Sequence, residues 1–244
     1  MQLTTTFPIP AAPVLMNHRS KVLTMGSCFS ASMGARLSLL PLEVKTQPFG
    51  TLFHPFAITR ALSGSVSEEV YEQNGYFLHP DYHSVFTATT ADELLDDVRS
   101  VGAEVSNFIA DTDFLLLTWG TSFSYFDKYL NESVANCHKM PADRFEKRLS
   151  SVDEIVENFS SLLSTLPSTT HVVLTVSPVR HTKDGMLENQ VSKSTLRLAA
   201  DIVSKRFENV HYFPAFEIML DELRDYRFYE ADLIHPNEQA QAYI

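Results

Sequence analysis

The stretch Leu23-Thr24-Met25-Gly26-Ser27-Cys28-Phe29-Ser30-Ala31 decides the fold, because a short apolar run stops at a glycine and a helical pattern begins just after it. The run 22–25 has the length and side-chain content of a buried strand, and Gly26 breaks it. Ser27 and Cys28 are therefore expected in a strand-to-helix turn. Unpaired N–H groups and the helix dipole favour a negative charge at such a position. A tight turn with a serine cap is the alternative.

The composition is that of one acidic α/β domain spanning residues 1–244. The chain is 44% hydrophobic with a formal net charge of −11, and its size suffices for one substantial core. The acidic charge and the lack of a basic stripe argue against a nucleic-acid partner. We see no signal peptide and no run long enough to span a membrane, so a cytoplasmic protein with no membrane partner is expected. Cys28 and Cys137 are expected to be free thiols.

Strand-like runs alternate with amphipathic helices along the chain. Strands are expected at 22–25, 42–46, 114–118, 171–176 and 210–213, and the main helices at 30–40, 91–109, 152–166 and 189–207. This alternation predicts a three-layer α/β/α sandwich with a mainly parallel, flavodoxin-like sheet.

Three segments fall outside this alternation. The pattern at 76–87 predicts a small accessory hairpin around a Pro-Asp turn, and 123–141 has no clear period and is expected to be a long structured loop. A final helix capped by Asn237 has only about two turns before Ile244, so we expect a truncated C-terminus.

Small and polar residues follow the strands at one rim of the predicted sheet. They are Gly26-Ser27-Cys28, Gln47-Pro48-Phe49-Gly50, Gly120-Thr121-Ser122 and Arg180-His181. Ligands of such sheets bind at the carboxyl ends of the strands, so this rim is the expected site.

Asp232 and His235 supply the second half of a hydrolytic site. An acid three residues before a histidine can orient one imidazole nitrogen while the other faces a nucleophile. With Ser27 after the first strand, the order of these parts resembles that of the SGNH or GDSL hydrolases.

The segment Gly26-Ser27-Cys28-Phe29-Ser30 nearly spells the signature of the GSCFA family, a group of bacterial proteins that resembles that superfamily. The resemblance extends over nearly the whole chain, through 47–53, 134–139, 177–181 and 221–229. It implies Ser27 as nucleophile, His235 as general base and then acid, and Asp232 as the group that orients His235. It also implies the N–H groups of Ser27 and Gly50 as oxyanion donors.

The chain departs from the superfamily at two places. Gly120-Thr121-Ser122 replaces the expected Gly-x-Asn, so Ser122 or Thr121 has to donate to the oxyanion, or Asn136 has to substitute from its long loop. The usual aspartate after the first glycine is also missing, since Ser27 follows Gly26.

Four further residues are candidates for substrate binding. Arg180 and His181 end a strand at the rim and could bind an anionic group, or form a plain surface pair. Trp119 could stack on a sugar ring or an acyl group, or pack the loop, and Thr121 lies beside it.

The expected function is an SGNH-like serine esterase or acyltransferase that acts on a small-molecule ester, for example an acylated carbohydrate, without metal or cofactor. One alternative is a ligand-binding module that has lost efficient turnover. A minor alternative is a thiol-dependent enzyme that uses Cys28, although Cys28 is expected to face the interior if Ser27 faces the site. The cysteine and histidine spacings do not support a metal cluster. The sequence leaves the oligomeric state open.

Overall fold

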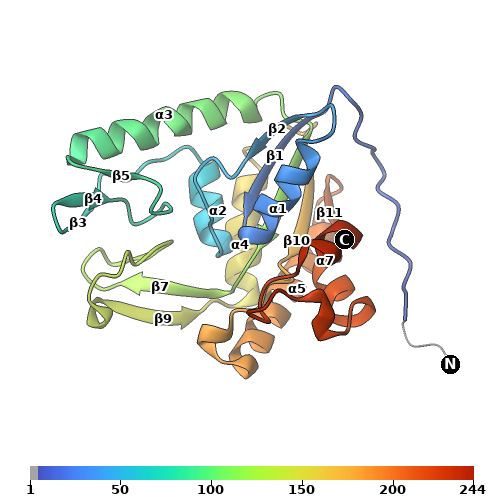
Figure 1. The fold of residues 1–244 in the computed structure, drawn as a ribbon. Helices are drawn as coiled ribbons and strands as arrows, with labels where there is room; N and C mark the ends of the chain where they lie inside the picture. Colours follow the sequence, from blue (N-terminus) through green and yellow to red (C-terminus); the bar gives the residue numbers. More distant parts are fainter. Residues whose placement is uncertain (1–4) are drawn as a thin grey trace.

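The computed structural model describes residues 5–244 and is built on a five-stranded parallel sheet in the order β11-β10-β6-β1-β2 (Figure 1). The strands are β1 (Lys21–Gly26), β2 (Glu43–Thr46), β6 (Phe114–Trp119), β10 (His171–Val176) and β11 (Val210–Tyr212). All five pair in parallel, as the alternating sequence pattern predicts.

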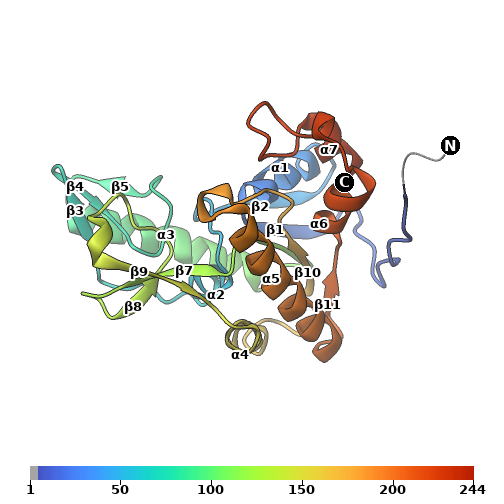
Figure 2. The same ribbon diagram turned by 90° about the horizontal axis from the view of Figure 1, so that it is seen from below.

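Helices cover both faces of this sheet, which confirms the predicted sandwich (Figure 2). One face carries α4 (Val152–Leu163) and α5 (Met186–Arg206), with α2 (Pro55–Leu62) packed on α4. The other face carries α1 (Cys28–Leu37), α6 (Ala215–Glu217) and α7 (Glu238–Tyr243), joined by a cluster of Phe29, Val179 and Ala215. Short helical turns lie at Ala142–Arg144, Thr182–Asp184, Ile218–Glu222 and Tyr226–Phe228.

Local sequence signals explain where several helices begin. Ser151 and Glu154 form a reciprocal capping box at the start of α4, and Thr90 caps α3 (Ala91–Ile109) through the N–H of Glu93. The predicted cap at Asn237 is confirmed, because its side chain accepts a hydrogen bond from the N–H of Ala240.

Two small antiparallel sheets lie on the same side of the main sheet, away from the N-terminal segment (Figure 1). The first contains β3 (Tyr71–Gln73), β4 (Tyr76–Leu78) and β5 (Thr87–Ala88). The expected hairpin is therefore present, because β4 pairs with β5 across a connection that contains Pro80 and Asp81. A further hairpin, from β3 to β4, turns at Asn74-Gly75. Asn74 and Gly75 both have positive φ, which is the conformation of the tight hairpin turn that Asn-Gly favours.

The second small sheet corrects the expected loop at 123–141. This segment contains β7 (Phe123–Asp127) and β8 (Glu132–Val134), and β9 (Phe145–Leu149) completes the sheet. The sequence pattern misleads because polar side chains of β7 point inward. Asp127 is fully buried and accepts hydrogen bonds from Arg144 Nε at 2.6 Å and Tyr71 Oη at 2.8 Å.

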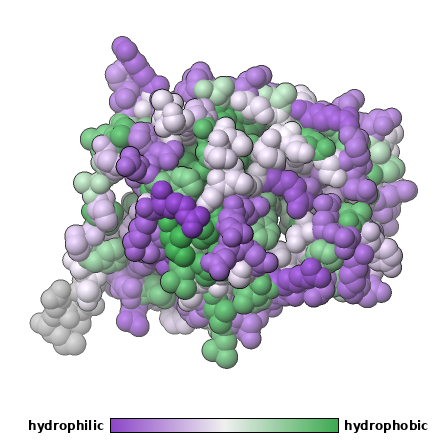
Figure 3. All heavy atoms as spheres, turned by 180° about the vertical axis from the view of Figure 1, so that it is seen from behind, coloured by the Kyte–Doolittle hydropathy of each residue, from purple (hydrophilic) through white to green (hydrophobic). Residues whose placement is uncertain are grey.

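In the described part of the chain, no helix has the length and apolar content needed to cross a membrane. On the face turned away from the view of Figure 1, hydrophilic residues predominate and smaller hydrophobic areas lie between them (Figure 3).

Candidate functional site

A cavity of about 370 Å³ lies at the carboxyl ends of the central strands, at the predicted rim. The main sheet and the loop before α7 form one part of its wall, and the β7 to β9 sheet forms another. The lining residues are Cys28, Phe53, His54, Thr121, Phe123, Ser124, Tyr125, Val134, Ala135, Val179, Arg180, His181, Thr182, Lys183, Asp184, Ile234 and His235.

Gly26 makes the sharp exit from β1 possible. Its φ is +133°, and a Cβ built there would lie 2.1 Å from the carbonyl oxygen of Thr118 on β6. The next residue, Ser27, donates its backbone N–H to the same oxygen at 3.0 Å. Only glycine allows so close an approach at this φ, so the turn that delivers Ser27 and Cys28 depends on it.

Ser27 faces the interior of the protein. Its side chain is fully buried, and its hydroxyl donates to Ser177 Oγ at 2.9 Å. Its carbonyl oxygen accepts from Gln47 Nε2 at 2.8 Å. Ser27 does not line the cavity, so of the two neighbouring residues in the turn it is the one whose side chain points into the protein.

Cys28 is the residue of the turn that reaches the cavity, which it lines together with His235. The expected orientation of the pair is therefore reversed, because the turn out of β1 directs Ser27 inward and Cys28 outward. Burial raises the pKa of the Cys28 thiol. The N–H groups of Phe29 and Cys28 at the start of α1, and the ammonium of Lys193, act in the opposite direction.

Asp232 and His235 form the predicted pair. Asp232 Oδ2 lies 2.7 Å from His235 Nδ1, while Asp232 Oδ1 accepts from the N–H groups of Ile234 and His235 at 2.8 and 3.1 Å. The hydrogen bond from His235 lowers the pKa of Asp232 to about 2, with help from the two backbone N–H groups. With Nδ1 turned toward Asp232, the imidazole has Nε2 left for chemistry in the cavity.

Arg180 supports the loop that carries this pair. Its backbone N–H donates to Ile234 O at 3.3 Å, and its guanidinium donates to Leu233 O at 3.2 Å. The guanidinium also lies over the ring of Tyr229, 4.1 Å from the centroid. Arg180 lines the cavity as expected, but both its backbone N–H and its guanidinium donate to carbonyl oxygens of the loop that carries Asp232 and His235.

His181 lines the cavity beside Phe53, whose ring it meets edge to face at 5.1 Å. Burial lowers the pKa of His181 to about 4, so its ring is neutral near pH 7. Its Nε2 is buried and has no hydrogen-bond partner among residues 5–244. This nitrogen is a polar group that a ligand can satisfy.

The four predicted oxyanion groups do not assemble as expected. The N–H of Gly50 closes a turn onto Gln47 O at 2.8 Å, and the N–H of Ser27 is used by Thr118. Ser122 is buried and donates through Oγ to Ser192 O at 3.2 Å. Asn136 does not line the cavity, and its Oδ1 accepts from the N–H of His138. Hydrogen bonds within the protein therefore occupy the donors of Ser27, Gly50 and Ser122.

Trp119 and Thr121 differ in their positions. Trp119 is fully buried at the end of β6 and packs edge to face against Phe159, so its predicted contact with a ligand is wrong. Thr121 does line the cavity, with Oγ1 3.1 Å from Ser192 Oγ.

Sequence reasoning missed two buried residues at the site. Lys193 on α5 is 1% exposed and donates to the carbonyl oxygens of Gly120 at 2.6 Å and Ser177 at 2.8 Å. Burial lowers its pKa to about 7. The sequence did carry a signal for the burial of Lys193, because this lysine lies at helical spacing from Leu196 and Ala200, which are buried in the core. His54, the cap of α2, is neutral because burial lowers its pKa to about 4.

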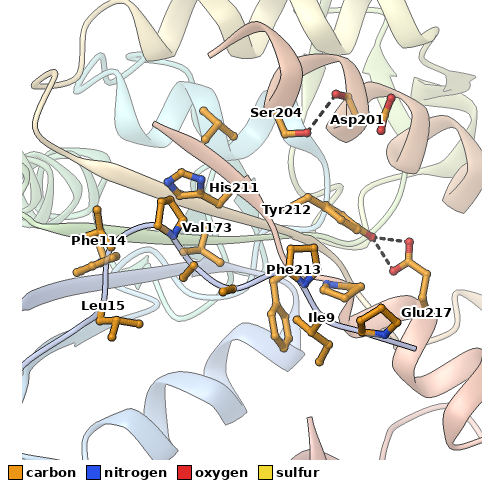
Figure 4. Close-up of a pocket in the computed structure, with 18 of the residues that line it drawn as sticks. Ile9, Leu15, Phe114, Val173, Asp201, Ser204, His211, Tyr212, Phe213 and Glu217 are labelled. Carbon is orange, nitrogen blue, oxygen red and sulfur yellow. Dashed lines mark hydrogen bonds between the residues drawn. The ribbon is translucent and has the colours of Figure 1, made fainter. Parts of the chain in front are cut away.

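A larger cavity of about 740 Å³ lies between the N-terminal segment, β11 and the end of α5 (Figure 4). Ile9 and Leu15 face it from the N-terminal segment, and His211, Tyr212 and Phe213 line it from β11 and the residue that follows. None of the residues predicted for the site lines this cavity.

A comparison with curated proteins finds no match to this chain. The GSCFA family model matches residues 21–244, a range that includes the Gly26 turn, Cys28 and the Asp232 and His235 pair. The chain therefore belongs to the GSCFA family.

Proposed function

We propose that the protein is a thiol-dependent hydrolase or acyltransferase that acts on esters through an acyl-Cys28 intermediate. The observation that carries the proposal is that Cys28 and His235 line one cavity, while Ser27 is fully buried. Asp232 Oδ2, 2.7 Å from His235 Nδ1, completes a Cys-His-Asp set. Cys28 thus replaces Ser27 as the proposed nucleophile, and the roles expected of His235 and Asp232 are kept.

In the proposed first step, Cys28 Sγ attacks the ester carbonyl carbon while His235 Nε2 accepts the thiol proton. Asp232 holds the imidazole and stabilises the imidazolium that forms. The tetrahedral intermediate then expels the alcohol, which takes the proton from His235, and a thioester on Cys28 remains. Water, activated by His235, releases the carboxylic acid in the second step, and another alcohol would give acyl transfer instead.

A general base is needed because burial raises the pKa of Cys28, so the thiol is protonated near pH 7. The N–H groups of Phe29 and Cys28 at the start of α1, which act on the Cys28 thiol, are the proposed donors for the developing oxyanion. With no amide side chain in the place of the usual Asn, we expect turnover about 10²- to 10³-fold below that of a complete oxyanion hole.

The cavity walls favour an acyl group of modest size. Phe53, Phe123, Val134, Val179 and Ile234 contribute apolar side chains to a volume of about 370 Å³. Such a surface binds hydrocarbon by excluding water, so we expect acyl esters of small molecules, including acylated carbohydrates, as the substrate class.

Turnover of short acyl nitrophenyl esters by variants tests the proposal. We expect Cys28→Ala to lose the activity, and Ser27→Ala and the matched thiol control Cys137→Ala to keep it. Iodoacetamide should inactivate the wild type, and a serine-directed fluorophosphonate should not. Activity retained in Cys28→Ala would reject Cys28 as the nucleophile.

A ligand-binding module on the same fold is the second candidate. It is favoured by the hydrogen bonds that occupy Gly50 N–H and Ser122 Oγ within the protein. If ester analogues bind in the cavity while no ester is turned over and no acyl-Cys28 forms, this candidate replaces the enzyme.

A further inference from the structure

We infer that the alcohol part of the ester substrate carries an anionic group, a carboxylate or a phosphate, which Arg180 binds with help from Lys183. This inference rests on the proposed function and deepens it, since it names a chemical class of substrate for the same site. Arg180 and Lys183 both line the cavity that Cys28 and His235 share.

The cavity has an excess of positive charge, although the chain as a whole has a formal net charge of −11. Among the described residues that line it, Asp184 is the one carboxylate, and Lys147 forms a salt bridge with it. Neither Arg180 nor Lys183 has a carboxylate of residues 5–244 within salt-bridge distance. These two cations therefore favour an anion as the ligand of the cavity.

Arg180 is fixed against the loop that carries His235. Its backbone N–H donates to Ile234 O at 3.3 Å, and Nη1 donates to Leu233 O at 3.2 Å. The guanidinium carbon lies 4.1 Å from the centroid of the Tyr229 ring. A guanidinium has five N–H groups, and the hydrogen bonds within the described part of the chain use one of them. A rigid set of donors is thus left for a carboxylate or a phosphate.

The position of Arg180 assigns the anion to the alcohol part of the ester. In the proposed first step His235 delivers a proton to the departing alcohol, so the ester oxygen has to lie at His235. Arg180 is hydrogen-bonded to Leu233 and Ile234, the two residues directly before His235. A group that Arg180 binds is therefore attached on the side of the departing oxygen, and the apolar wall receives the acyl group.

Lys183 acts on the anion at longer range. It belongs to the short helical turn Thr182–Asp184, and its side chain is exposed. The field of an exposed ammonium is screened by salt over about 10 Å at 0.1 M ionic strength. We therefore expect Lys183 to affect the capture of an anionic substrate and Arg180 to affect its affinity.

Acetate esters that differ in charge test the inference. The alcohol part of para-acetoxybenzoate carries a carboxylate, that of para-acetoxyphenyl phosphate carries a phosphate, and that of para-acetoxybenzamide carries a neutral amide. Each kcat/KM is divided by the rate of hydrolysis of that ester in buffer alone, which removes differences in intrinsic reactivity. We expect at least one anionic ester to be preferred over the amide about tenfold, the lower range for a charge-assisted hydrogen bond, because the cavity is open to solvent. Added sodium chloride should reduce this preference.

Variants identify the residues that produce the preference. Arg180→Gln should abolish most of it, and because a loss of loop support lowers the turnover of all the esters alike, the ratio between charged and neutral esters is the readout. Lys183→Gln, at an exposed position, should lower the ratio about two- to threefold. Lys205→Gln is the matched control and should leave the ratio unchanged, because Lys205 is an exposed lysine of α5 that does not line the cavity.

Two results would overturn the inference. One is a wild-type ratio near one for both anionic esters, and the other is an unchanged ratio in folded Arg180→Gln. If Arg180→Gln fails to fold, an unchanged ratio in Lys183→Gln counts against the inference in its place.

A binding measurement separates this inference from the proposed function. Titration with para-hydroxybenzoate and para-hydroxybenzamide, followed by nuclear magnetic resonance, needs no ester turnover. Tighter binding of the benzoate that is lost in Arg180→Gln would support the anion site even if Cys28 forms no acyl intermediate. Conversely, turnover that depends on Cys28, with equal rates for charged and neutral esters, would reject the role of Arg180 alone.

Discussion

The Gly26→Ala substitution should destabilise the protein strongly, because it places a methyl group against the backbone of β6. At a φ of +133°, a non-glycine residue costs about 1–3 kcal/mol. The added Cβ would also lie 2.1 Å from Thr118 O. Forcing β1 away from β6 to relieve this contact adds about 1–3 kcal/mol. We therefore expect a loss of about 4 kcal/mol in the free energy of unfolding.

Urea unfolding followed by circular dichroism measures this loss. With a denaturant slope of about 2–3 kcal/mol/M, the midpoint should fall by about 1.5 M. Gly102→Ala on α3 is the matched control, because a Cβ there meets nothing within 4 Å. That change should stabilise the protein by about 0.5–1 kcal/mol. A loss below about 1 kcal/mol for Gly26→Ala would refute the close approach of β1 to β6.

Three further variants follow from the site. Asp232→Asn should lower kcat for ester turnover about 10²- to 10⁴-fold, because His235 loses the partner that orients it, and an unchanged kcat would exclude the pair from catalysis. Ser27→Ala should lower the free energy of unfolding by about 1–2 kcal/mol through the lost hydrogen bond to Ser177, and most of the activity should be kept. Urea unfolding measures the loss of stability, and a loss of turnover as large as that of Cys28→Ala would contradict the prediction. The pKa of His54 is lowered to about 4, so the folded state resists its protonation. The contribution of His54 to stability should therefore fall by about 1.6 kcal/mol from pH 6.5 to pH 5, and His54→Asn should remove that part of the fall. An equal fall in both proteins would contradict the neutral buried ring.

The main sheet is predictable from the sequence because its strands are short apolar runs separated by amphipathic helices. Strand β6 and the helix before it show how direct this signal is, since Leu115 and Leu117 are fully buried as their pattern predicts. The β7 to β9 sheet has no such signal. Its buried Asp127 depends on Arg144 and Tyr71, which are distant in sequence, and polar residues at inward positions hide the alternation of a strand.

The candidate site shows the same division between local and distant information. The Asp232 and His235 pair is local in sequence, and the structure brings the two side chains together as predicted. Which residue of the turn faces the cavity depends instead on the approach of Gly26 to β6, which composition cannot reveal. The resemblance did hold a clue for the proposal, because Ser27 stands where the SGNH pattern has its aspartate, and Cys28 follows at the position that holds the nucleophile in that pattern.

The oxyanion donors were the least predictable part. Gly50 N–H and Ser122 Oγ are both used by acceptors inside the protein. The acceptor of Gly50, Gln47 O, belongs to the same tight turn, whereas the acceptor of Ser122, Ser192 O, lies on α5, 70 residues away in sequence. Whether a donor is already used depends on local turn geometry and on tertiary contacts, so residue type alone overestimates the number of donors that are available to a ligand.

The most direct test of the central claim is the site of acylation after acid quenching of the protein with a nitrophenyl ester. Trypsin is expected to release residues 22–36, a peptide that contains both Ser27 and Cys28, and fragmentation in the mass spectrometer locates the acyl group. We predict an acyl group on Cys28 that neutral hydroxylamine removes, as it does for a thioester. An acyl group on Ser27 that resists neutral hydroxylamine would contradict the account.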